Sequence, residues 1–359
     1  MNTGGIAQKL IDFAKILVGR IPGGLAHTNI LGNTLFGSLS GSSVAASVAI
    51  GGVLIPMEEK EGYDKKFAAA VNIASAPTGL IIPPSGILII YPVLAGCSVV
   101  GMIMSGYIPR PDVGTGLHGR AYVIAKKNHY PTAGKVPASV FFKYFVDAIP
   151  SLLLIVIIVG GVMSGIFTAT ESAAVAVAYT LFLSIVVYRS IKIKDLPKIL
   201  LDACETTAVI MFLIAGSNVM SFVMSFTGLP SAIGNALISV SSNKYVILLI
   251  INLVLLVVGC FMDITPAVLI FTPIFLPVVQ SFGMDPIHFG IMMVMNLGIG
   301  NITPPVGSAL FSGCSVADMD MEDMIKPILP FYAAIFVALM LVAYVPWFSM
   351  ALPTLFGAV

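Results

Sequence analysis

Four short segments hold the side chains and backbone groups of this sequence that could bind a small ion. Two of them, SLSGSSVA (38–45) and CFMDITPA (260–267), place hydroxyls and one carboxylate inside apolar runs. The other two, TGLIIPPSG (78–86) and IGNITPPVG (299–307), each contain a Pro-Pro pair. Adjacent prolines cannot complete a helical hydrogen-bond pattern, so they leave backbone carbonyls without partners. Carbonyl and hydroxyl oxygens together suit Na⁺, and the N-terminal ends of interrupted helices suit an anion.

Two carboxylates lie inside or beside apolar segments. Asp263 could bind Na⁺, or it could cap a half-helix by accepting backbone N–H groups, and the sequence leaves both interpretations open. Glu171 lies in FTATESAAVA, where TATES is typical of a turn followed by a helix start. We therefore expect Glu171 to be a cap or an interhelical hydrogen-bond partner.

The composition is that of a membrane protein. Of the 359 residues, 58% are hydrophobic and 10% are charged, whereas a soluble domain carries about 25% charged residues. A net charge of +1 gives no indication of a nucleic-acid partner. The four cysteines and four histidines show no ligand spacing, and the sequence contains no GxxxxGK[ST], HExxH or GxSxG motif. We predict an all-α polytopic membrane protein that is not an enzyme and has no cofactor.

Hydropathy divides the chain into apolar runs that suit eight to ten crossings or hairpins, at roughly 20 residues for each span. Residues 5–20 predict an amphipathic helix that is too charged to span and suits the membrane interface. The apolar runs are 27–54, 67–108, 144–162, 165–188, 206–227, 245–262, 263–281, 286–314 and 328–350, with polar segments at 109–137 and 189–205.

An internal repeat relates the two Pro-Pro breaks. A shift of 221 residues brings Asp64 onto Asp285, and Gly79, Pro83 and Pro84 onto Gly300, Pro304 and Pro305. The same shift places Ser42 opposite Asp263. One alternative is chance matching of apolar residues, but Pro, Gly and Asp coincide at one shift. The other alternative is that the breaks are ordinary proline kinks, but the four interruptions form two matching pairs. Both facts favour a repeat.

Charge indicates that the two copies have opposite orientations. The loop 57–66 carries Lys60, Lys65 and Lys66, whereas its counterpart 278–287 carries no Lys or Arg. Lysine and arginine concentrate in cytoplasmic loops, so we expect the first loop to be cytoplasmic and the second to lie on the other side. Inverted repeats are typical of secondary transporters, whose broken helices meet near mid-membrane.

Five segments carry a resemblance to a known family: LFGSLSGSSVAASVAIGGVLIPMEEKEGYDKKFAAA, GLIIPPSG, GIFTATESAAVAV, DITPAVLIFTPIFLPV and GIGNITPPVG. In this order, over residues 1–355, the chain resembles the large membrane subunit of tripartite ATP-independent periplasmic (TRAP) transporters. The resemblance implies an elevator-type secondary transporter of the ion-transporter superfamily, with two re-entrant helical hairpins. It implies residence in the bacterial inner membrane and Na⁺-driven import of a C4-dicarboxylate, sugar acid or sialic acid. The implied partners are a periplasmic substrate-binding protein, a small four-helix membrane subunit and membrane lipid.

The resemblance also implies site residues. Two Na⁺ sites are expected, each built from a hairpin tip and the adjacent break. Their expected members are Ser40, Ser42, Gly79 and Pro83 for the first, and Asp263, Thr265, Gly300 and Thr303 for the second. The substrate is expected between the tips, in contact with Ser43, Thr78, Ser85, Thr265 and Asn301.

Three features depart from the family pattern. Members usually begin with two further hydrophobic helices, so the chain is expected to lack N-terminal scaffold helices. Residues 109–121 carry Arg110, Asp112, His118 and Arg120 where the family has an apolar helix, so a weakened or absent span is expected there. The first tip often carries an aspartate where this chain has Ala46.

The expected organisation and function follow from these observations. The predicted regions are an interfacial helix (1–26), a first repeat core (27–108), a polar connector or weakened span (109–143), scaffold spans and connector (144–244), a second repeat core (245–324) and a C-terminal span (325–359). The function predicted first is that of a TRAP permease subunit. The alternatives are a stand-alone ion or anion exchanger and a truncated, inactive remnant of such a permease.

Overall fold

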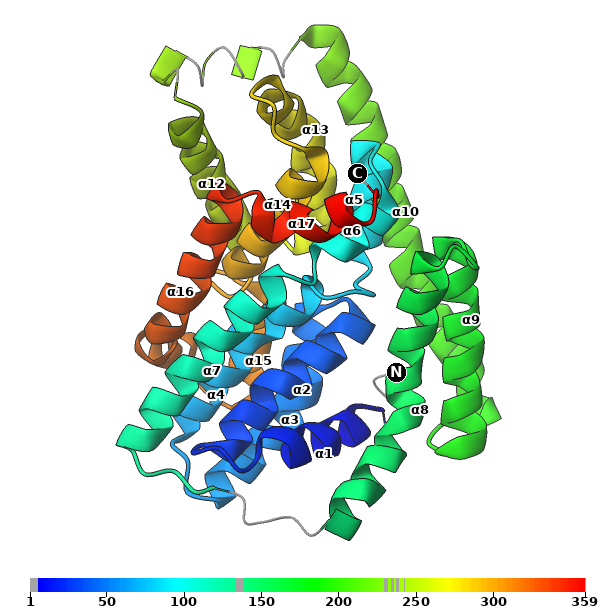
Figure 1. Cartoon of the computed structure of the whole chain (residues 1–359), viewed down its shortest axis with the longest axis vertical. Coiled ribbons are helices and arrows are strands. Elements are labelled where there is room, and N and C mark those ends of the chain that lie inside the picture. The colour runs from blue at the N-terminus through cyan, green and yellow to red at the C-terminus, as the bar shows by residue number, and fades with distance from the viewer. Residues whose placement is uncertain are drawn as a thin grey trace.

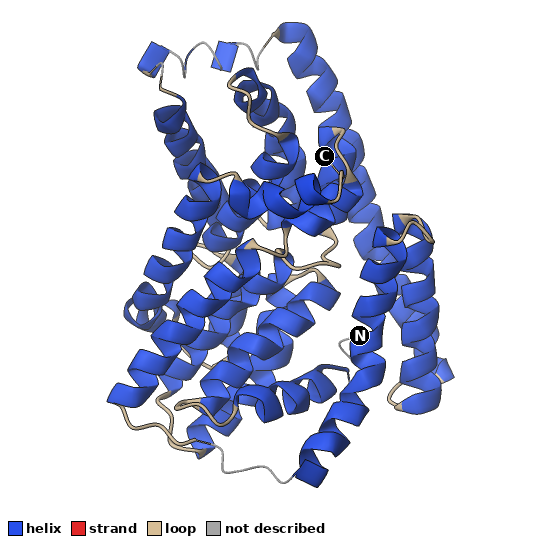
Figure 2. Ribbon diagram, viewed as in Figure 1, coloured by secondary structure: helices blue, strands red, loops and turns tan. Residues whose placement is uncertain are grey.

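The structure is a computed structural model that describes residues 6–132, 138–228 and 243–358, together with 232–233, 236 and 239–241. Figure 2 shows helices joined by loops, and the described residues contain no strand. Within these residues, five helices are long and apolar enough to cross a membrane, judged by length and composition. They cover Phe141–Met163, Ala169–Val187, Ile193–Met224, Lys244–Phe261 and Met321–Tyr344. The polytopic all-α prediction agrees with this architecture.

Two helical hairpins and two interrupted helices form the centre of the molecule. The first hairpin consists of α2 (Gly24–Ser40) and α3 (Ser43–Lys60), and the second of α12 (Lys244–Phe261) and α13 (Ile264–Ser281). The first interrupted helix comprises α4 (Lys65–Ser75), the 3₁₀ turn η1 (Ala76–Leu80) and α5 (Ile87–Ala95), and the second comprises α14 (Pro286–Gly300) and α15 (Ser308–Val316).

The 221-residue shift holds in the structure. It carries the bounds of α3 onto those of α13, and the bounds of α5 onto those of α15, without an offset. The hairpins lie in opposite halves of the molecule, with α2 and α3 in the lower half of Figure 1 and α12 and α13 in the upper half. Irregular backbone lies between them, near the middle of the molecule, where Figure 2 shows several loops.

The two repeats interlock. Helix α15 of the second repeat packs against α3 of the first, and α5 of the first repeat packs against α13 of the second. Each interrupted helix therefore has its first half beside its own hairpin and its second half beside the other hairpin. Close packing is visible at Gly313 in α15, where an added Cβ atom would lie 2.3 Å from the Ile73 side chain and 2.8 Å from Ser47 Oγ.

The remaining helices surround this centre. Their bounds are α1 (Ile6–Val18), α6 (Val99–Ser105), α7 (Pro109–Lys127), α8 (Ala138–Met163), α9 (Ala169–Phe182) with the π turn η2 (Leu183–Val187), the 3₁₀ turn η3 (Ile193–Asp195), α10 (Leu196–Thr227), α16 (Met321–Tyr344) and α17 (Trp347–Leu355). Helices α8, α9 and α10 lie along one side of the molecule (Figure 1). They expose large apolar side chains such as Phe142, Phe212 and Phe226, as expected of a surface that faces lipid or another membrane protein.

Three segments show structure that the sequence patterns did not specify. Helix α1 packs its apolar face against α2 and α8, with Leu10, Ile11 and Ala14 fully buried. Residues 109–127, expected as a weakened span or connector, form the continuous helix α7, which packs against α16 and α2. The expected connector 189–205 turns helical at Ile193, because η3 leads directly into α10.

Partners within the protein explain how α7 accommodates polar residues. Arg120 Nε donates to the carbonyl of Pro330 at 3.2 Å. The His118 ring stacks on His27 of α2, and the two Nδ1 atoms lie 2.7 Å apart. Arg120 and His118 therefore have partners within the protein, which the expectation of a weakened or absent span did not include.

Candidate functional site

The tip of the first hairpin is a two-residue turn between α2 and α3. Gly41 adopts φ 64°, a left-handed conformation that favours glycine, and its N–H group bonds the carbonyl of Gly37. Ser42 is the N-cap of α3, because its hydroxyl accepts a hydrogen bond from the Ala45 N–H group at 3.2 Å. Ser43 follows at the first helical position and is buried. The tip thus places hydroxyls at a helix N-terminus.

The tip of the second hairpin has the same plan with a carboxylate in place of the hydroxyl. Met262 ends α12 and Asp263 precedes α13 in an extended conformation. Asp263 makes no side-chain capping hydrogen bond, and its Oδ1 instead lies 3.4 Å from Asn301 Nδ2. The Asp263 side chain is exposed in the isolated chain, so it is open to a ligand.

The two breaks lie directly against the hairpin tips. An added Cβ atom on Gly79 would lie 2.4 Å from the Gly37 Cα atom, and one on Gly300 would lie 2.5 Å from the Gly259 Cα atom. Real Cβ atoms do not approach other atoms so closely, so each pair of facing positions requires glycine. At each break, the backbone of the interrupted helix therefore lies against the backbone of a hairpin helix.

Both interruptions contain the same backbone feature. The peptide bonds Pro83–Pro84 and Pro304–Pro305 are cis. Beyond the second pair, the Gly307 N–H group donates to the carbonyl of Cys260 at 2.9 Å, which joins the break to the end of α12. Beyond the first pair, Ser85 is fully buried and its hydroxyl has no hydrogen-bond partner among the described residues. Such an unpaired buried hydroxyl is available to a ligand.

Asn301 joins the two repeats at the centre. Its Nδ2 atom donates to Ser43 Oγ at 2.8 Å and lies 3.4 Å from Asp263 Oδ1, so one amide contacts both hairpin tips. Its Oδ1 accepts a hydrogen bond from the Ser308 hydroxyl at 2.7 Å, and its backbone carbonyl accepts from the Ala309 and Leu310 N–H groups. Asn301 is fully buried. The two tips and the second break therefore form one connected group.

The other predicted residues lie in the tips and breaks, where most of their contacts are local. Ser40 lies within the first tip, and its hydroxyl contacts the Ser42 backbone at 3.4–3.5 Å. Thr78 is buried and bonds the Thr34 hydroxyl at 2.9 Å and the Ser75 carbonyl at 2.6 Å. The Thr303 hydroxyl donates to the Ile299 carbonyl at 2.6 Å. Thr265 is half-buried in the first turn of α13. Their roles in binding ions or substrate stay predictions.

Sequence reasoning missed several polar partners. Asn33 of α2 donates to Asn72 Oδ1 and Ser75 Oγ, each at 3.0 Å, and so links the first hairpin to α4. Ser308 fixes the orientation of the Asn301 amide, and the Tyr332 hydroxyl bonds the Ile302 carbonyl within the second break. Asn29 and Asn33 lie four residues apart in an apolar run, a spacing that predicts a polar stripe on one helix face. This spacing could have predicted that Asn33 contacts polar groups of a neighbouring helix.

The oxygens at this centre suit a monovalent cation. They are hydroxyls, carbonyls and the single carboxylate of Asp263, and no group of three or more His, Cys, Asp or Glu side chains occurs in the described part of the chain. A site with at most one formal negative charge and hard oxygen ligands fits Na⁺ better than a divalent ion.

These features define a polytopic membrane protein whose two matched halves bring hairpin tips and broken helices to one centre. The family model of the tripartite ATP-independent periplasmic transporter, DctM component, matches residues 1–348, and the chain belongs to this family. The structure and this match together assign the chain to the membrane permeases.

Relatives of this chain include permeases that are named for different substrates. The chain is 51% identical to the uncharacterized protein YgiK of Salmonella typhimurium, over 99% of this chain and 82% of that protein. It is 38% identical to the C4-dicarboxylate TRAP transporter large permease protein DctM of Pseudomonas aeruginosa, over 99% and 84% of the two chains. It is also 38% identical to the sialic acid TRAP transporter large permease protein SiaM of Vibrio cholerae, over 99% and 83%.

Proposed function

We propose that this chain is the permease subunit of a tripartite transporter and imports a small organic anion by Na⁺ symport across the bacterial inner membrane. The observation that carries the proposal is the meeting of both hairpin tips with the second break at Asn301. Irregular backbone at membrane depth is tolerated where it is buried in protein or lines a polar cavity. Such backbone supplies ion ligands and helix N-termini in one place.

The chemistry of this centre and the names of relatives support a substrate class. Helix α3 begins at the first tip, α13 at the second, and α5 and α15 begin just after the breaks. Helix N-termini attract negative charge, so four of them around one centre favour a carboxylate. Relatives are named for C4-dicarboxylates and for sialic acid, both of which are carboxylic acids. We place the substrate of this chain among C4-dicarboxylates, sugar acids and sialic acids.

Two Na⁺ sites form part of the proposal. The first comprises Ser40, Ser42, Gly79 and Pro83, and the second comprises Asp263, Thr265, Gly300 and Thr303. The substrate lies between them, near Ser43, Thr78, Ser85, Thr265 and Asn301. The Asn301–Ser43 hydrogen bond joins the first tip to the second break, so in this proposal the substrate reaches its position only when that contact opens.

The interlocked packing supports an elevator mechanism. Because α15 packs on α3 and α13 packs on α5, the hairpins and interrupted helices form one body that can move as a unit. In the proposed mechanism, this body carries ions and substrate past a scaffold that includes α8, α9 and α10, with the two hairpins re-entrant from opposite sides. A small membrane subunit would cover the exposed apolar side of this scaffold, and a periplasmic binding protein would deliver the substrate.

Uptake into proteoliposomes tests the proposal. The full chain is reconstituted with its small membrane subunit, and labelled succinate or sialic acid is supplied on its cognate binding protein. We expect uptake that requires an inward Na⁺ gradient and disappears when K⁺ replaces Na⁺. Equal uptake in K⁺ would refute Na⁺ coupling. Uptake of free substrate without the binding protein would instead support the stand-alone exchanger.

A further inference from the structure

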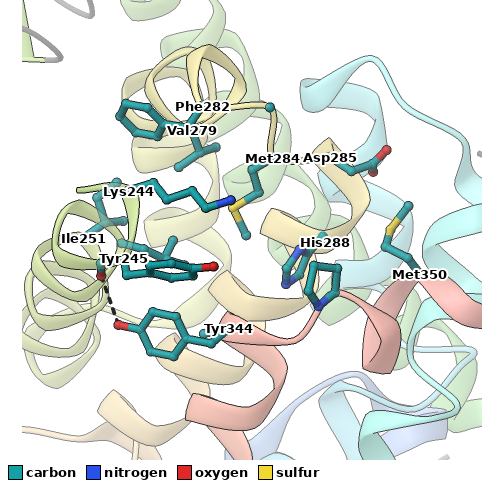
Figure 3. Close-up of a pocket in the computed structure, with 14 residues that line it drawn as sticks. Lys244, Tyr245, Ile251, Val279, Phe282, Met284, Asp285, His288, Tyr344 and Met350 are labelled. Atoms are coloured by element: carbon teal, nitrogen blue, oxygen red, sulfur yellow. Dashed lines mark hydrogen bonds between the residues drawn. The ribbon is translucent and has the colours of Figure 1, made fainter. Parts of the chain in front are cut away.

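A cavity lies far from the hairpin tips. It has a volume of about 250 Å³ and lies between the N-terminus of α12, the turn that joins α13 to α14, and the segment from the end of α16 to α17 (Figure 3). Lys244 begins α12, whereas the second tip follows the other end of this helix. An 18-residue helix is about 27 Å long, so the cavity is separate from the centre described above.

Lys244 and Tyr245 supply the polar groups that are free to bind a ligand. Figure 3 shows the Lys244 amine and the Tyr245 hydroxyl reaching into the cavity. The Lys244 Nζ atom lies 5.2 Å from the centroid of the Tyr245 ring. Within the described parts of the chain, neither the Lys244 amine nor the Tyr245 hydroxyl has a hydrogen-bond or ion-pair partner. Both residues are exposed, so the cavity presents one cation, held over an aromatic ring, and one hydroxyl that are open to a ligand.

The other polar side chains of the cavity hold its walls in place. The Asp285 carboxylate accepts a hydrogen bond from the Ile287 N–H group at 2.7 Å and so caps α14. The His288 Nε2 atom lies 2.8 Å from the carbonyl of Val342, and the Tyr344 hydroxyl donates to the carbonyl of Tyr245 at 3.2 Å. These contacts tie α14 and α12 to α16, so the walls are formed before any ligand binds.

Apolar side chains complete the lining. They come from α12, α13, the turn before α14, α16 and α17, and they include Leu248, Ile251, Phe282, Met284 and Met350. Small-molecule sites commonly combine apolar walls with a few polar groups that fix orientation. The lining also contains the Asp285 carboxylate, so the match to an anion is local: an anionic head fits beside Lys244 and Tyr245, and an apolar body fits against these side chains.

We propose that this cavity binds an amphiphilic anion, with one carboxylate or phosphate head and a short apolar body. The head is held by Lys244 and Tyr245. The cavity volume accommodates a chain of about eight carbons. Free carboxylates and the phosphate of a membrane lipid share this head-group chemistry. The proposal is independent of the transport function, because binding is measured without uptake.

The single tryptophan of the chain provides the measurement. Trp347 follows Pro346, which lines the cavity, so a brominated ligand in the cavity should quench its fluorescence. The purified full chain is titrated with 8-bromooctanoate and with 8-bromooctanol as the uncharged probe. We expect saturable quenching by the carboxylate and only a linear, non-saturating response to the alcohol. Absence of saturation by the carboxylate would overturn the proposal.

Variants assign the site to these two residues. Lys244→Gln should weaken 8-bromooctanoate binding about tenfold, Tyr245→Phe about threefold, and Lys244→Arg should retain most of the affinity. Lys126 lies 6.0 Å from the Tyr122 ring and does not line the cavity, so Lys126→Gln and Tyr122→Phe are matched controls that should bind as the wild type does. Unchanged binding in Lys244→Gln would refute the proposal.

Nanodiscs distinguish the two sources of the anionic head. If a lipid phosphate occupies the cavity, phosphatidylglycerol discs should suppress 8-bromooctanoate binding relative to phosphatidylcholine discs, and Lys244→Gln should retain less phosphatidylglycerol in native mass spectrometry. If the ligand is a free carboxylate, 8-bromooctanoate should bind equally in both discs. If phosphatidylglycerol suppresses 8-bromooctanoate binding equally in Lys244→Gln and in the wild type, the lipid does not act through this cavity.

Discussion

The Asn301 Nδ2 atom lies 2.8 Å from Ser43 Oγ, although 258 residues separate the two in the sequence. The same amide lies 3.4 Å from Asp263, at the tip of the other hairpin. Both tips therefore share one hydrogen-bond donor. A change at either tip alters the contacts of this amide, so Asn301 gives the two repeats a direct physical connection.

Replacing Asn301 with alanine should cost both stability and transport. The change leaves the buried Ser43 hydroxyl and the half-buried Ser308 hydroxyl without their partner, and losing such a partner costs about 1–3 kcal/mol. We expect a lower thermal unfolding midpoint in detergent and at least a tenfold loss of uptake. Ser43→Ala removes one of these bonds and should have a smaller effect. A double-mutant cycle should give a coupling energy of about 1 kcal/mol, and strict additivity would contradict a direct Asn301–Ser43 contact.

Alanine at Gly79 or Gly300 should destabilise the protein by about 1–3 kcal/mol, because each new methyl group overlaps facing backbone. Gly86 is the matched control, since it lies in the first break, has a φ of −60°, and an added Cβ there meets no atom within 4 Å. Thermal unfolding of the three variants in detergent gives the comparison. Equal loss of stability in Gly86→Ala would show that the close approach of the helices is not the cause.

Asp263→Asn should raise the Na⁺ concentration needed for half-maximal uptake about tenfold, because the change removes the only carboxylate at the centre and weakens a charge-assisted contact. Asp202 is exposed on α10, so Asp202→Asn is the control and should leave this concentration unchanged. The measurement is the initial rate of uptake against the Na⁺ gradient. If Asp263→Asn loses stability while its Na⁺ dependence is unchanged, the residue has a structural role instead.

The start of α9 should be important for folding and not for ion coupling. Thr168 and Glu171 form a capping box, with the Thr168 hydroxyl accepting from the Glu171 N–H group and the Glu171 carboxylate accepting from the Thr168 N–H group. Thr168→Ala should cost about 1 kcal/mol of stability. Its Na⁺ dependence of uptake, measured beside that of the wild type, should not change. A shift in that dependence would place this turn in the transport pathway.

Local patterns were sufficient to predict the elements of the centre. Prolines and glycines that recur after 221 residues predicted both breaks, and the match between α5 and α15 follows the shift without an offset. The cap at Glu171 is confirmed by its contacts with Thr168. In each case the signal is contained within a few consecutive residues, because helix interruption and capping are local properties of the chain.

Contacts between distant segments could not be predicted in the same way. Hydropathy gave no indication that α15 packs on α3, since both segments are apolar and would satisfy many partners. The polar residues of 109–121 predicted a weakened or absent span, and the sequence did not reveal that Pro330 and His27 supply partners for Arg120 and His118. The placement of Asn301 among three elements likewise depends on tertiary structure. The roles of the predicted ion and substrate residues stay predictions.

The interlocked packing has a consequence for synthesis of the chain. Helix α3 exposes a face that is covered only when α15 has emerged from the ribosome, and these helices begin at residues 43 and 308. Translation proceeds at about 5–20 residues per second, so roughly 13–53 seconds separate the synthesis of the two helix starts. During that time the first half of the nascent chain has no native partner for this face. Assembly of the centre must therefore be a late event, completed only after most of the protein has entered the membrane.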